Sequence, residues 1–291
     1  MVFLYALYPE YEGKSHIEIN SKMKINDSIR HTAEYIRNVR STGRYAFSID
    51  DLLRHLPKSV RNIRKDIDRL RKKGDVITIR KGFYTIIPDE YKNMGVIPVE
   101  FYIDELMTYL EKKYYVGLYS AAMFHGAAHQ QPQEFYVICD KPRPRSISND
   151  KFLINFTEKV NYPIYGIVKK KTDTGYFNIS GVELTLLDMI YMADSLGGYS
   201  RIVSVLVELG EKVTLVGMKE AIKNDFPISV YQRAGFIAEK ILKNEKLALL
   251  FENKLSKQTL KTLLLKPAGD STGVKLDRWR LICNVEIEND L

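Results

Sequence analysis

Two stretches near the N-terminus carry apolar residues at helical spacing. In residues 27–44 the positions Ile29, Ala33, Ile36 and Val39 recur near the helical period, and Gly43 follows as a C-terminal stop. In residues 48–56 leucines form one apolar face, and Ser48 with Asp51 three residues later is a capping-box pattern. The pattern therefore predicts two short helices, the second beginning just after Ser48.

A third helix followed by a two-stranded hairpin is predicted next. Over residues 59–73 the apolar positions Ile63, Ile67 and Leu70 share one helix face, and Gly74 supplies a left-handed exit. Residues 76–87 then alternate apolar and polar positions on both sides of Gly82, which is typical of a hairpin. Three helices followed by a hairpin predict a winged helix-turn-helix, whose third helix would enter a DNA major groove.

The outer face of the third helix carries the candidate DNA contacts. Asp68 lies among the basic residues of this face, and a carboxylate close to phosphates is repelled, so the C-terminal half should stand away from DNA. The N-terminal half is expected to read bases, since Arg can bind guanine and Asn can bind adenine through two hydrogen bonds. The predicted base-reading residues are Lys58, Arg61, Asn62 and Lys65, and the predicted phosphate contacts are Arg64, Arg80 and Lys81.

The rest of the chain mixes helical and strand patterns. A turn-rich segment at residues 88–98 is a reasonable linker, followed by a helix over 99–115, a helix ending near Gly126 and a strand at 134–139. A hairpin is expected around Thr174, Ser180 with Glu183 is a second capping-box pattern, and helices and two strand-like runs complete the chain. The predicted fold class is α+β, with a leader or arm at 1–25, a winged helix-turn-helix domain at 26–92 and a C-terminal domain at 96–291.

Charge supports a polyanion partner for the N-terminal unit. The net charge is +8, and residues 26–92 hold 16 Lys and Arg against 9 Asp and Glu, while the remainder holds 28 against 27. A basic unit beside a neutral one suggests a nucleic-acid-binding module attached to another domain, although a basic surface can also serve solubility alone. No apolar run is long enough to span a membrane, and two isolated cysteines indicate reduced thiols, so the cytoplasm is the expected compartment.

Motifs for catalysis are weak. His125 and His129 have the spacing of a zinc helix, but Gly126 stands where a catalytic Glu would follow, and no third ligand is evident. Neither a phosphate-binding loop nor a nucleophile elbow is present in the sequence. Glu134, Asp140 and Lys141 loosely match a nuclease core at a spacing that is common by chance. We therefore expect no catalytic residue, no cofactor and no metal.

Three longer segments resemble the AbiEi family, the antitoxins of type IV abortive-infection toxin–antitoxin systems. The segments are FSIDDLLRHLPKSVRNIRKDIDRLRKKGDVITIRKGFYTI, LYSAAMFHGAAHQQPQEFYVICDK and ISGVELTLLDMIYMADSLGGYSRIVSVLVELGEKV. The more specific features are a loop with His125, Gly126, Gln131 and Pro132, and the helix from Glu183 to Asp188. The resemblance spans roughly residues 45–285, so the segment before Met23 lies outside it.

The resemblance implies an autoregulatory antitoxin without enzymatic activity. Its N-terminal domain would bind inverted repeats of double-stranded DNA in its own promoter and repress the operon. Its C-terminal domain would counter a nucleotidyltransferase toxin encoded by the adjacent gene and would assist DNA binding. A stable complex with the toxin would not be required. Two alternatives stay open on the residues alone: a winged-helix transcription regulator that senses a ligand or partner, and a nuclease targeted by the winged helix.

Overall fold

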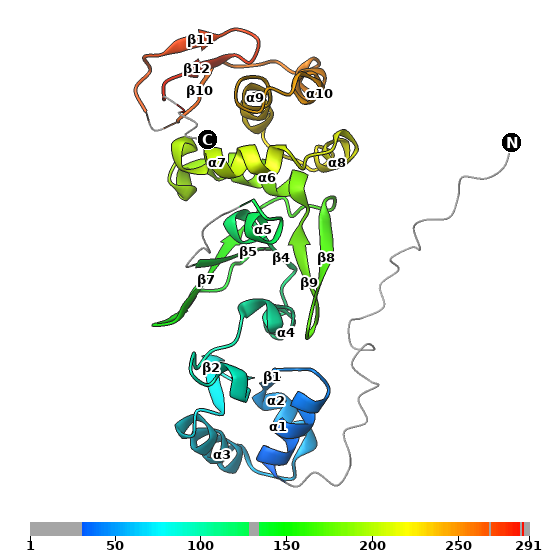
Figure 1. The fold of residues 1–291 in the computed structure, drawn as a ribbon, viewed down its shortest axis with the longest axis vertical. Coiled ribbons are helices and arrows are strands. Elements are labelled where there is room, and N and C mark those ends of the chain that lie inside the picture. Colours follow the sequence, from blue (N-terminus) through cyan, green and yellow to red (C-terminus); the bar gives the residue numbers. More distant parts are fainter. Residues whose placement is uncertain (1–30, 128–133, 268, 286, 288–291) are drawn as a thin grey trace, which may run out of the picture.

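The computed structural model describes residues 31–127, 134–267, 269–285 and 287 as an elongated stack of layers (Figure 1). A small unit of three helices and three strands lies at the lower end of Figure 1, and a six-stranded sheet follows above it. Helices cover the upper side of that sheet, and a small C-terminal sheet lies at the far end. The molecule is therefore mixed α+β, as the sequence predicted.

The N-terminal unit contains the three predicted helices and the predicted hairpin. Its elements are α1 (Thr32–Ser41), β1 (Ala46–Ser48), α2 (Ile49–His55), α3 (Val60–Lys72), β2 (Val76–Arg80) and β3 (Phe83–Ile86). The capping box at Ser48 is confirmed, since its hydroxyl accepts from the Asp51 amide at 3.0 Å and the Asp51 carboxylate accepts from the Ser48 amide at 2.8 Å. Gly82 has a φ of +85° at the hairpin turn, as expected. The short strand β1, which pairs with β3, was not predicted.

The N-terminal sheet is buried on both faces. Phe47 and Ile86 pack toward α1, α2 and α3, whereas Ala46, Ile79 and Phe83 belong to a core shared with the rest of the chain. That shared core includes the apolar residues of the next helix: Ile103, Leu106 and Met107. Successive side chains of these strands thus point alternately into two different cores, and the hairpin lies between the two cores.

The central sheet has the strand order β6-β7-β5-β4-β9-β8. Its elements and their neighbours are η2 (Asp89–Tyr91), η3 (Val99–Phe101), α4 (Ile103–Tyr109), β4 (Tyr114–Val116), α5 (Leu118–Phe124), β5 (Glu134–Cys139), β6 (Ile147–Asn149), β7 (Phe152–Glu158), β8 (Ile167–Thr172) and β9 (Gly175–Ser180). The strand at 134–139 is confirmed, but the helix predicted over 99–115 is wrong in length. It ends at Tyr109, because Tyr114 and Tyr115 enter the sheet and are buried on its opposite faces.

A helical layer and a small sheet complete the chain. They comprise α6 (Val182–Tyr191), η4 (Ala193–Leu196), α7 (Tyr199–Gly210), α8 (Leu215–Ala221), α9 (Ile228–Phe236), the π-helical turn η5 (Ile237–Ile241), α10 (Glu245–Leu255), β10 (Leu263–Leu264), β11 (Val274–Leu276) and β12 (Leu281–Cys283). Trp279, 1% exposed, fixes the small sheet on α9. Its indole lies so close to the Gly235 backbone that a Cβ there would overlap the ring.

Candidate nucleic-acid interface

The third helix, α3, lies at the end of the molecule away from the small C-terminal sheet (Figure 1), and its polar face is exposed. Ile63 and Ile67, at most 2% exposed, anchor the opposite face on the N-terminal core, which includes Tyr35 and Val39 of α1. Ser59 caps the helix and its hydroxyl accepts from the Asn62 amide at 3.4 Å. The predicted contact residues Arg61, Asn62, Arg64 and Lys65 are all exposed.

Lys58 differs from the other predicted base readers. Its ammonium lies 2.7 Å from the Asp66 carboxylate, and only 23% of its side chain is exposed. Asp66 also accepts a hydrogen bond of 2.8 Å from the Thr32 hydroxyl of α1. Lys58 and Asp66 therefore connect the start of α3 to its second turn and to α1. The pairing of Lys58 with Asp66 competes with contact between Lys58 and a base.

The carboxylates in the second half of α3 are paired within the helix. Asp68 lies 3.5 Å from Arg71, and Asp66 lies 3.6 Å from Arg69. These i,i+3 pairs reduce the cationic character of the C-terminal half. The first half keeps Arg61, Arg64 and Lys65, so the positive charge of α3 is concentrated near its N-terminal turns.

The hairpin tip faces the larger part of the chain rather than the end where α3 lies. The hydroxyl of Tyr109 on α4 donates to the Lys81 carbonyl at 3.2 Å, and a Cβ on Gly82 would meet that hydroxyl at 2.5 Å. Arg80 is half-buried, and its guanidinium donates to the carbonyl of Arg145 at 3.4 Å. The Lys81 side chain is exposed. Arg80 and Lys81 are thus not brought together with the α3 cations as one continuous tip.

Two groups of residues near these cations were not predicted from the sequence. Tyr84 on β3 is half-buried beside α3, and burial raises the pKa of its hydroxyl while the charges of Arg71 and Arg64 oppose the rise. The loop after β5 carries the exposed side chains Lys141, Arg143 and Arg145, and the Arg145 carbonyl of this loop accepts from Arg80. The alternation of β3 indicated that Tyr84 shares a face with Ile86. The proximity of the loop comes from tertiary structure alone.

An ion pair also joins the two parts of the chain. Arg44, between α1 and β1, pairs with Glu105 of α4, and both side chains are at most one-third exposed. Burial raises the pKa of Glu105, while Arg44 opposes the rise. This contact and the shared core hold the N-terminal unit against α4.

The loop with His125, Gly126, Gln131 and Pro132, here called the HG motif, makes structural contacts with other elements. The His125 ring lies 2.7 Å from the Ser180 carbonyl through Nε2, and burial lowers the pKa of the imidazole. Lys212, after α7, donates to the carbonyls of His125 and Gly126 at 2.5 and 2.7 Å. His129, Gln131 and Pro132 lie outside the described residues. The described half of the motif thus joins α5 to β9 and to the end of α7.

The helix from Glu183 to Asp188 is also held by polar contacts at both ends. The capping box predicted for Ser180 and Glu183 is wrong, because Gly181 is the N-cap and Glu183 instead accepts from the amide and hydroxyl of Thr214, both at 2.9 Å. The fully buried carboxylate of Asp188 accepts from Lys159 at 2.6 Å and from the Tyr115 hydroxyl at 2.8 Å. Glu183 and Asp188 therefore act in packing α6 against α8 and the sheet.

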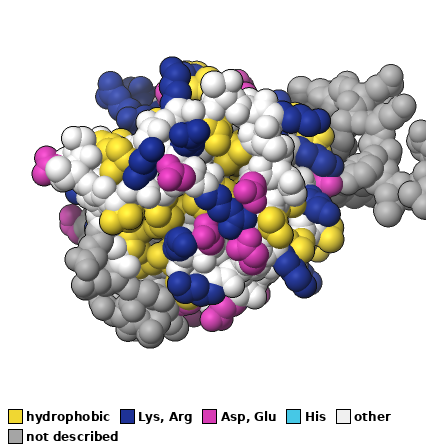
Figure 2. All heavy atoms as spheres, turned by 90° about the horizontal axis from the view of Figure 1, so that it is seen from above, with side chains coloured by type: hydrophobic (Ala, Val, Ile, Leu, Met, Phe, Trp, Pro, Cys, Tyr) yellow, Lys and Arg dark blue, Asp and Glu magenta, His cyan; other side chains and the backbone are white. Residues whose placement is uncertain are grey.

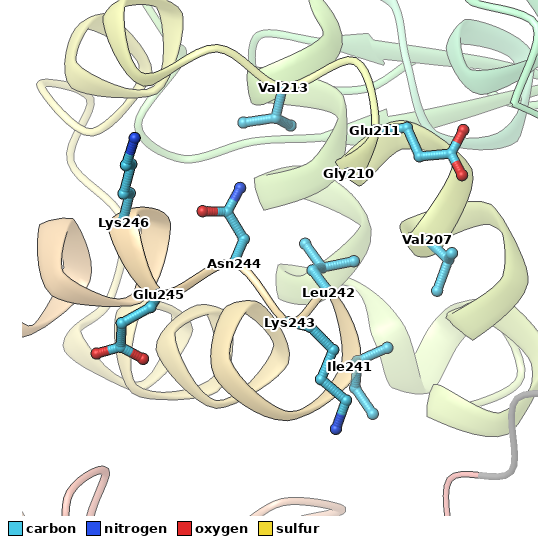
Figure 3. Close-up of a pocket in the computed structure, with 10 residues that line it drawn as sticks. All are labelled: Val207, Gly210, Glu211, Val213, Ile241, Leu242, Lys243, Asn244, Glu245 and Lys246. Carbon is cyan, nitrogen blue, oxygen red and sulfur yellow. The ribbon is translucent and has the colours of Figure 1, made fainter.

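A shallow groove of about 630 Å³ separates the end of α7 from the turn before α10 (Figure 3). Its walls combine the aliphatic side chains Val207, Val213, Ile241 and Leu242 with charged groups of both signs. Figure 3 shows the charged side chains spread along the rim and pointing in different directions. The groove therefore presents no converging set of acid, base or nucleophile.

The residues considered for a nuclease core lie apart. Glu134 begins β5 and accepts from Asn155 at 2.6 Å, whereas Asp140 follows the other end of that strand, 4.0 Å from Lys112. In the described part of the chain, no group of three or more His, Cys, Asp or Glu side chains is arranged to hold a metal ion. Among the same residues, no helix combines the length and apolar character needed to cross a membrane.

Charge is mixed at the end of the molecule opposite α3. Seen from that end, Lys and Arg side chains alternate with Asp and Glu (Figure 2). Arg278 illustrates this, since it lies 2.8 Å from both Glu245 and Glu252. This end of the molecule therefore shows no concentration of one sign of charge among the described residues.

Comparisons with known proteins give a similar fold for most of the chain and a family match for residues 115–240. The fold is similar to the crystal structure of the RV2827C protein from Mycobacterium tuberculosis, with a TM-score of 0.60 and 14% identity over 85% of this chain and 89% of that one. No curated protein matches the sequence. Residues 115–240 match the model of the AbiEi antitoxin C-terminal domain, and this segment contains the HG motif, the helix from Glu183 to Asp188 and most of the central sheet. This match supports the resemblance of these motifs to the AbiEi antitoxin family of toxin–antitoxin systems.

Proposed function

We propose that the chain is an operator-binding antitoxin whose residues 26–92 form a winged helix-turn-helix and whose α3 enters the DNA major groove. The observation that carries this proposal is the exposed cationic face of α3 at the end of the molecule farthest from the small C-terminal sheet (Figure 1). A helix anchored by Ile63 and Ile67 on one side and basic on the other matches the recognition helix of such domains.

The N-terminal half of α3 provides the base contacts in this proposal. Arg61, Asn62 and Lys65 are exposed and carry the donors and acceptors that read base edges, and Arg64 holds a phosphate. Lys58, already paired with Asp66, positions the helix and contacts DNA only if that pair opens. The paired carboxylates Asp66 and Asp68 keep the other half of α3 away from phosphates.

Phosphate contacts continue at the hairpin. Lys81 offers an exposed ammonium there, and the neighbouring loop adds Lys141, Arg143 and Arg145. Arg80 donates a hydrogen bond from one guanidinium nitrogen to the Arg145 carbonyl, and this bond holds the loop against the hairpin. Because α4 fixes the hairpin, these cations keep a constant position relative to α3.

The biological role follows from the family. An AbiEi antitoxin implies a toxin partner. We propose that this partner is a nucleotidyltransferase encoded by the adjacent gene, and that the chain represses the shared operon by binding inverted repeats in the cytoplasm. Finding a nucleotidyltransferase reading frame in the adjacent gene would be the simplest supporting observation.

The DNA interface is tested by measuring operator affinity of single variants. Arg61→Ala should lower affinity by about 1–3 kcal/mol and blur the preference between operator and unrelated duplex. Lys81→Ala should weaken binding to both duplexes and make the log–log salt slope shallower by about 0.9. Arg201→Ala, an exposed arginine on α7, is the matched control and should bind as the parent does. Unchanged affinity for both test variants would remove α3 and the hairpin tip from the DNA interface.

Neutralisation is tested separately in cells. A full-length variant with Arg61, Arg64 and Lys65 all replaced by Ala keeps the AbiEi domain and the α4 contacts intact. Co-expressed with the adjacent toxin gene from an independent promoter, it should protect the cells although it no longer represses the operon. Cell death at normal antitoxin levels would show that countering the toxin requires the DNA-binding face.

A further inference from the structure

The start of α3 carries a cation that is held by the N-terminal unit itself. Lys58 precedes the cap residue Ser59, at the end of the helix that the proposed function places against DNA. Its side chain is 23% exposed, whereas Arg61 and Lys65 are exposed residues. The carboxylate of Asp66 lies 2.7 Å from the Lys58 ammonium. The charge of Lys58 is thus paired within the protein rather than offered to an outside anion.

Asp66 is fixed by contacts that do not involve Lys58. The hydroxyl of Thr32 on α1, a residue only 2% exposed, donates to one carboxylate oxygen of Asp66 at 2.8 Å. Arg69 lies 3.6 Å from the other carboxylate oxygen. Because these contacts hold the carboxylate, the long and flexible Lys58 side chain is the more mobile member of the pair. Asp66 therefore acts as a fixed acceptor that draws the ammonium back toward the helix.

The pair lies on the side of α3 that is proposed to read bases. Asn62 and Asp66 are four residues apart, so they are neighbours on one side of the helix, and Asn62 is exposed. Since the Lys58 ammonium reaches Asp66, it lies on this side as well. A recognition helix contacts base edges and the flanking phosphates with its first turns. A duplex read by Asn62 would therefore bring phosphates close to the Lys58 ammonium.

Asp66 and a DNA phosphate would compete for the same ammonium. A partly exposed pair of lysine and carboxylate is a weak interaction, and a single phosphate contact is also weak at physiological salt. The pair with Asp66 has the advantage that it exists before DNA arrives. Contact with a phosphate has to break this pair and to order the Lys58 side chain again in a new position. Asp66 should therefore withhold one cation from any duplex, whatever its sequence.

We propose that Asp66 restrains Lys58 and thereby lowers the affinity of the chain for every duplex by about one phosphate contact. The inference rests on the proposed function, because it requires α3 to face DNA. Asp66 is a positioning residue, since it acts through Lys58 and touches no DNA itself. A pair with a purely structural role would have the opposite effect, because loosening the start of α3 would weaken binding.

The test is a salt titration of binding to two duplexes of equal length, one from the promoter region of this gene and one unrelated. Asp66→Asn retains an acceptor for Thr32 and frees Lys58. Its log–log salt slope should be steeper than that of the parent by about 0.9 on both duplexes, which raises affinity about 8-fold at about 0.1 M salt. Asp68→Asn is the matched control and should leave the slope unchanged, because it removes the same charge from the same helix but frees only Arg71.

A double variant shows whether the effect passes through Lys58. Adding Lys58→Ala to Asp66→Asn restores the net charge of the parent, and both the slope and the affinity should return to the parent values. A gain that persists in the double variant would mean that Asp66 repels DNA directly, and it would overturn the proposal. The proposal would equally be overturned by the same gain in Asp68→Asn, or by an Asp66→Asn variant that binds no more tightly than the parent.

A measurement without DNA separates this inference from the proposed function. Acylation of amines, followed by mass spectrometry of the peptides, should label Lys58 more slowly than Lys65 in the parent, and Asp66→Asn should abolish the difference. Equal labelling of the two lysines in the parent would overturn the restraint itself. If Lys58 is protected but Arg61→Ala leaves the affinity for both duplexes unchanged, the proposed function fails, and the role of the restraint in DNA binding fails with it.

Discussion

The buried ion pair between Lys159 and Asp188 gives the sharpest stability prediction. Lys159 is 5% exposed and Asp188 is fully buried, and their charged atoms are 2.6 Å apart. The second carboxylate oxygen of Asp188 accepts from Tyr115 at 2.8 Å, and the ammonium lies over the ring of Phe226. Replacing Lys159 with Met keeps a side chain of similar length but leaves the carboxylate without its counter-charge.

The expected cost is large because the remaining charge is enclosed by protein. Removing one partner of a buried pair lowers the free energy of unfolding by about 3–5 kcal/mol. Changing Asp188 to Asn in the same protein removes the unpaired charge and retains an acceptor for Tyr115. The double variant should therefore recover most of the loss of Lys159→Met, and it should be more stable than the sum of the two single losses predicts, because Asp188→Asn alone also leaves a buried charge unpaired.

The pH dependence offers an internal check. Burial raises the pKa of Asp188, and Lys159 opposes that rise, so the Met variant should have a higher folded-state pKa than the parent. Below the unfolded pKa of about 3.9 the carboxyl is neutral in both states, and the penalty is absent. The penalty then grows as the pH rises toward the folded-state pKa. The stability gap between the Met variant and the parent should accordingly narrow at acidic pH.

Urea unfolding of the parent, both single variants and the double variant measures these quantities. A loss below about 1 kcal/mol for Lys159→Met, or strict additivity of the two single changes, would refute the view that this pair is a desolvated, mutually dependent unit. A stability gap that stays constant between pH 7 and pH 4 would contradict the electrostatic origin.

Three further outcomes follow from single contacts. Gly235→Ala should displace Trp279, lowering the free energy of unfolding by about 3 kcal/mol and shifting to the red the fluorescence of the single tryptophan; an unshifted spectrum would contradict the packing. Ser48→Ala should cost about 1 kcal/mol through loss of the helix cap, seen as a lower melting temperature. His125→Gln should flatten the loss of stability that accompanies acidification below about pH 6.5, because burial lowers the folded-state pKa of this imidazole and the unfolded chain takes up the proton first; thermal melts across pH measure the slope.

Local patterns were sufficient for the three helices and the hairpin of the N-terminal unit, but not for the short strand β1. The cap at Ser48, the apolar stripe through Ile63 and Ile67, and the glycines at 74 and 82 each act through neighbours within a few residues. The same patterns predicted β5 and most helices of the larger part. These elements are determined by residues close to one another in the sequence, so the sequence alone was sufficient to predict them.

Predictions that depended on partners distant in sequence were less successful. Ser180 and Glu183 have capping spacing, yet Glu183 bonds to Thr214, 31 residues away. Tyr114 and Tyr115 continue a helical pattern but are drawn into the sheet by β5 and β9. Arg80 had the features of a free hairpin-tip cation, and the carbonyl that it contacts belongs to a loop 65 residues later. The predicted DNA contacts themselves stay predictions.

The two-sided burial of the N-terminal sheet sets a limit on protein engineering. A chimaera made by cutting near residue 92 would transplant a sheet whose Ile79 and Phe83 lose their cover, and the acceptor would expose Met107 and Leu106 in return. Exchange of operator specificity between relatives should therefore carry α4 along with the helices, or be confined to surface positions of α3. Substitutions confined to surface positions of α3 leave both cores that flank the N-terminal sheet intact.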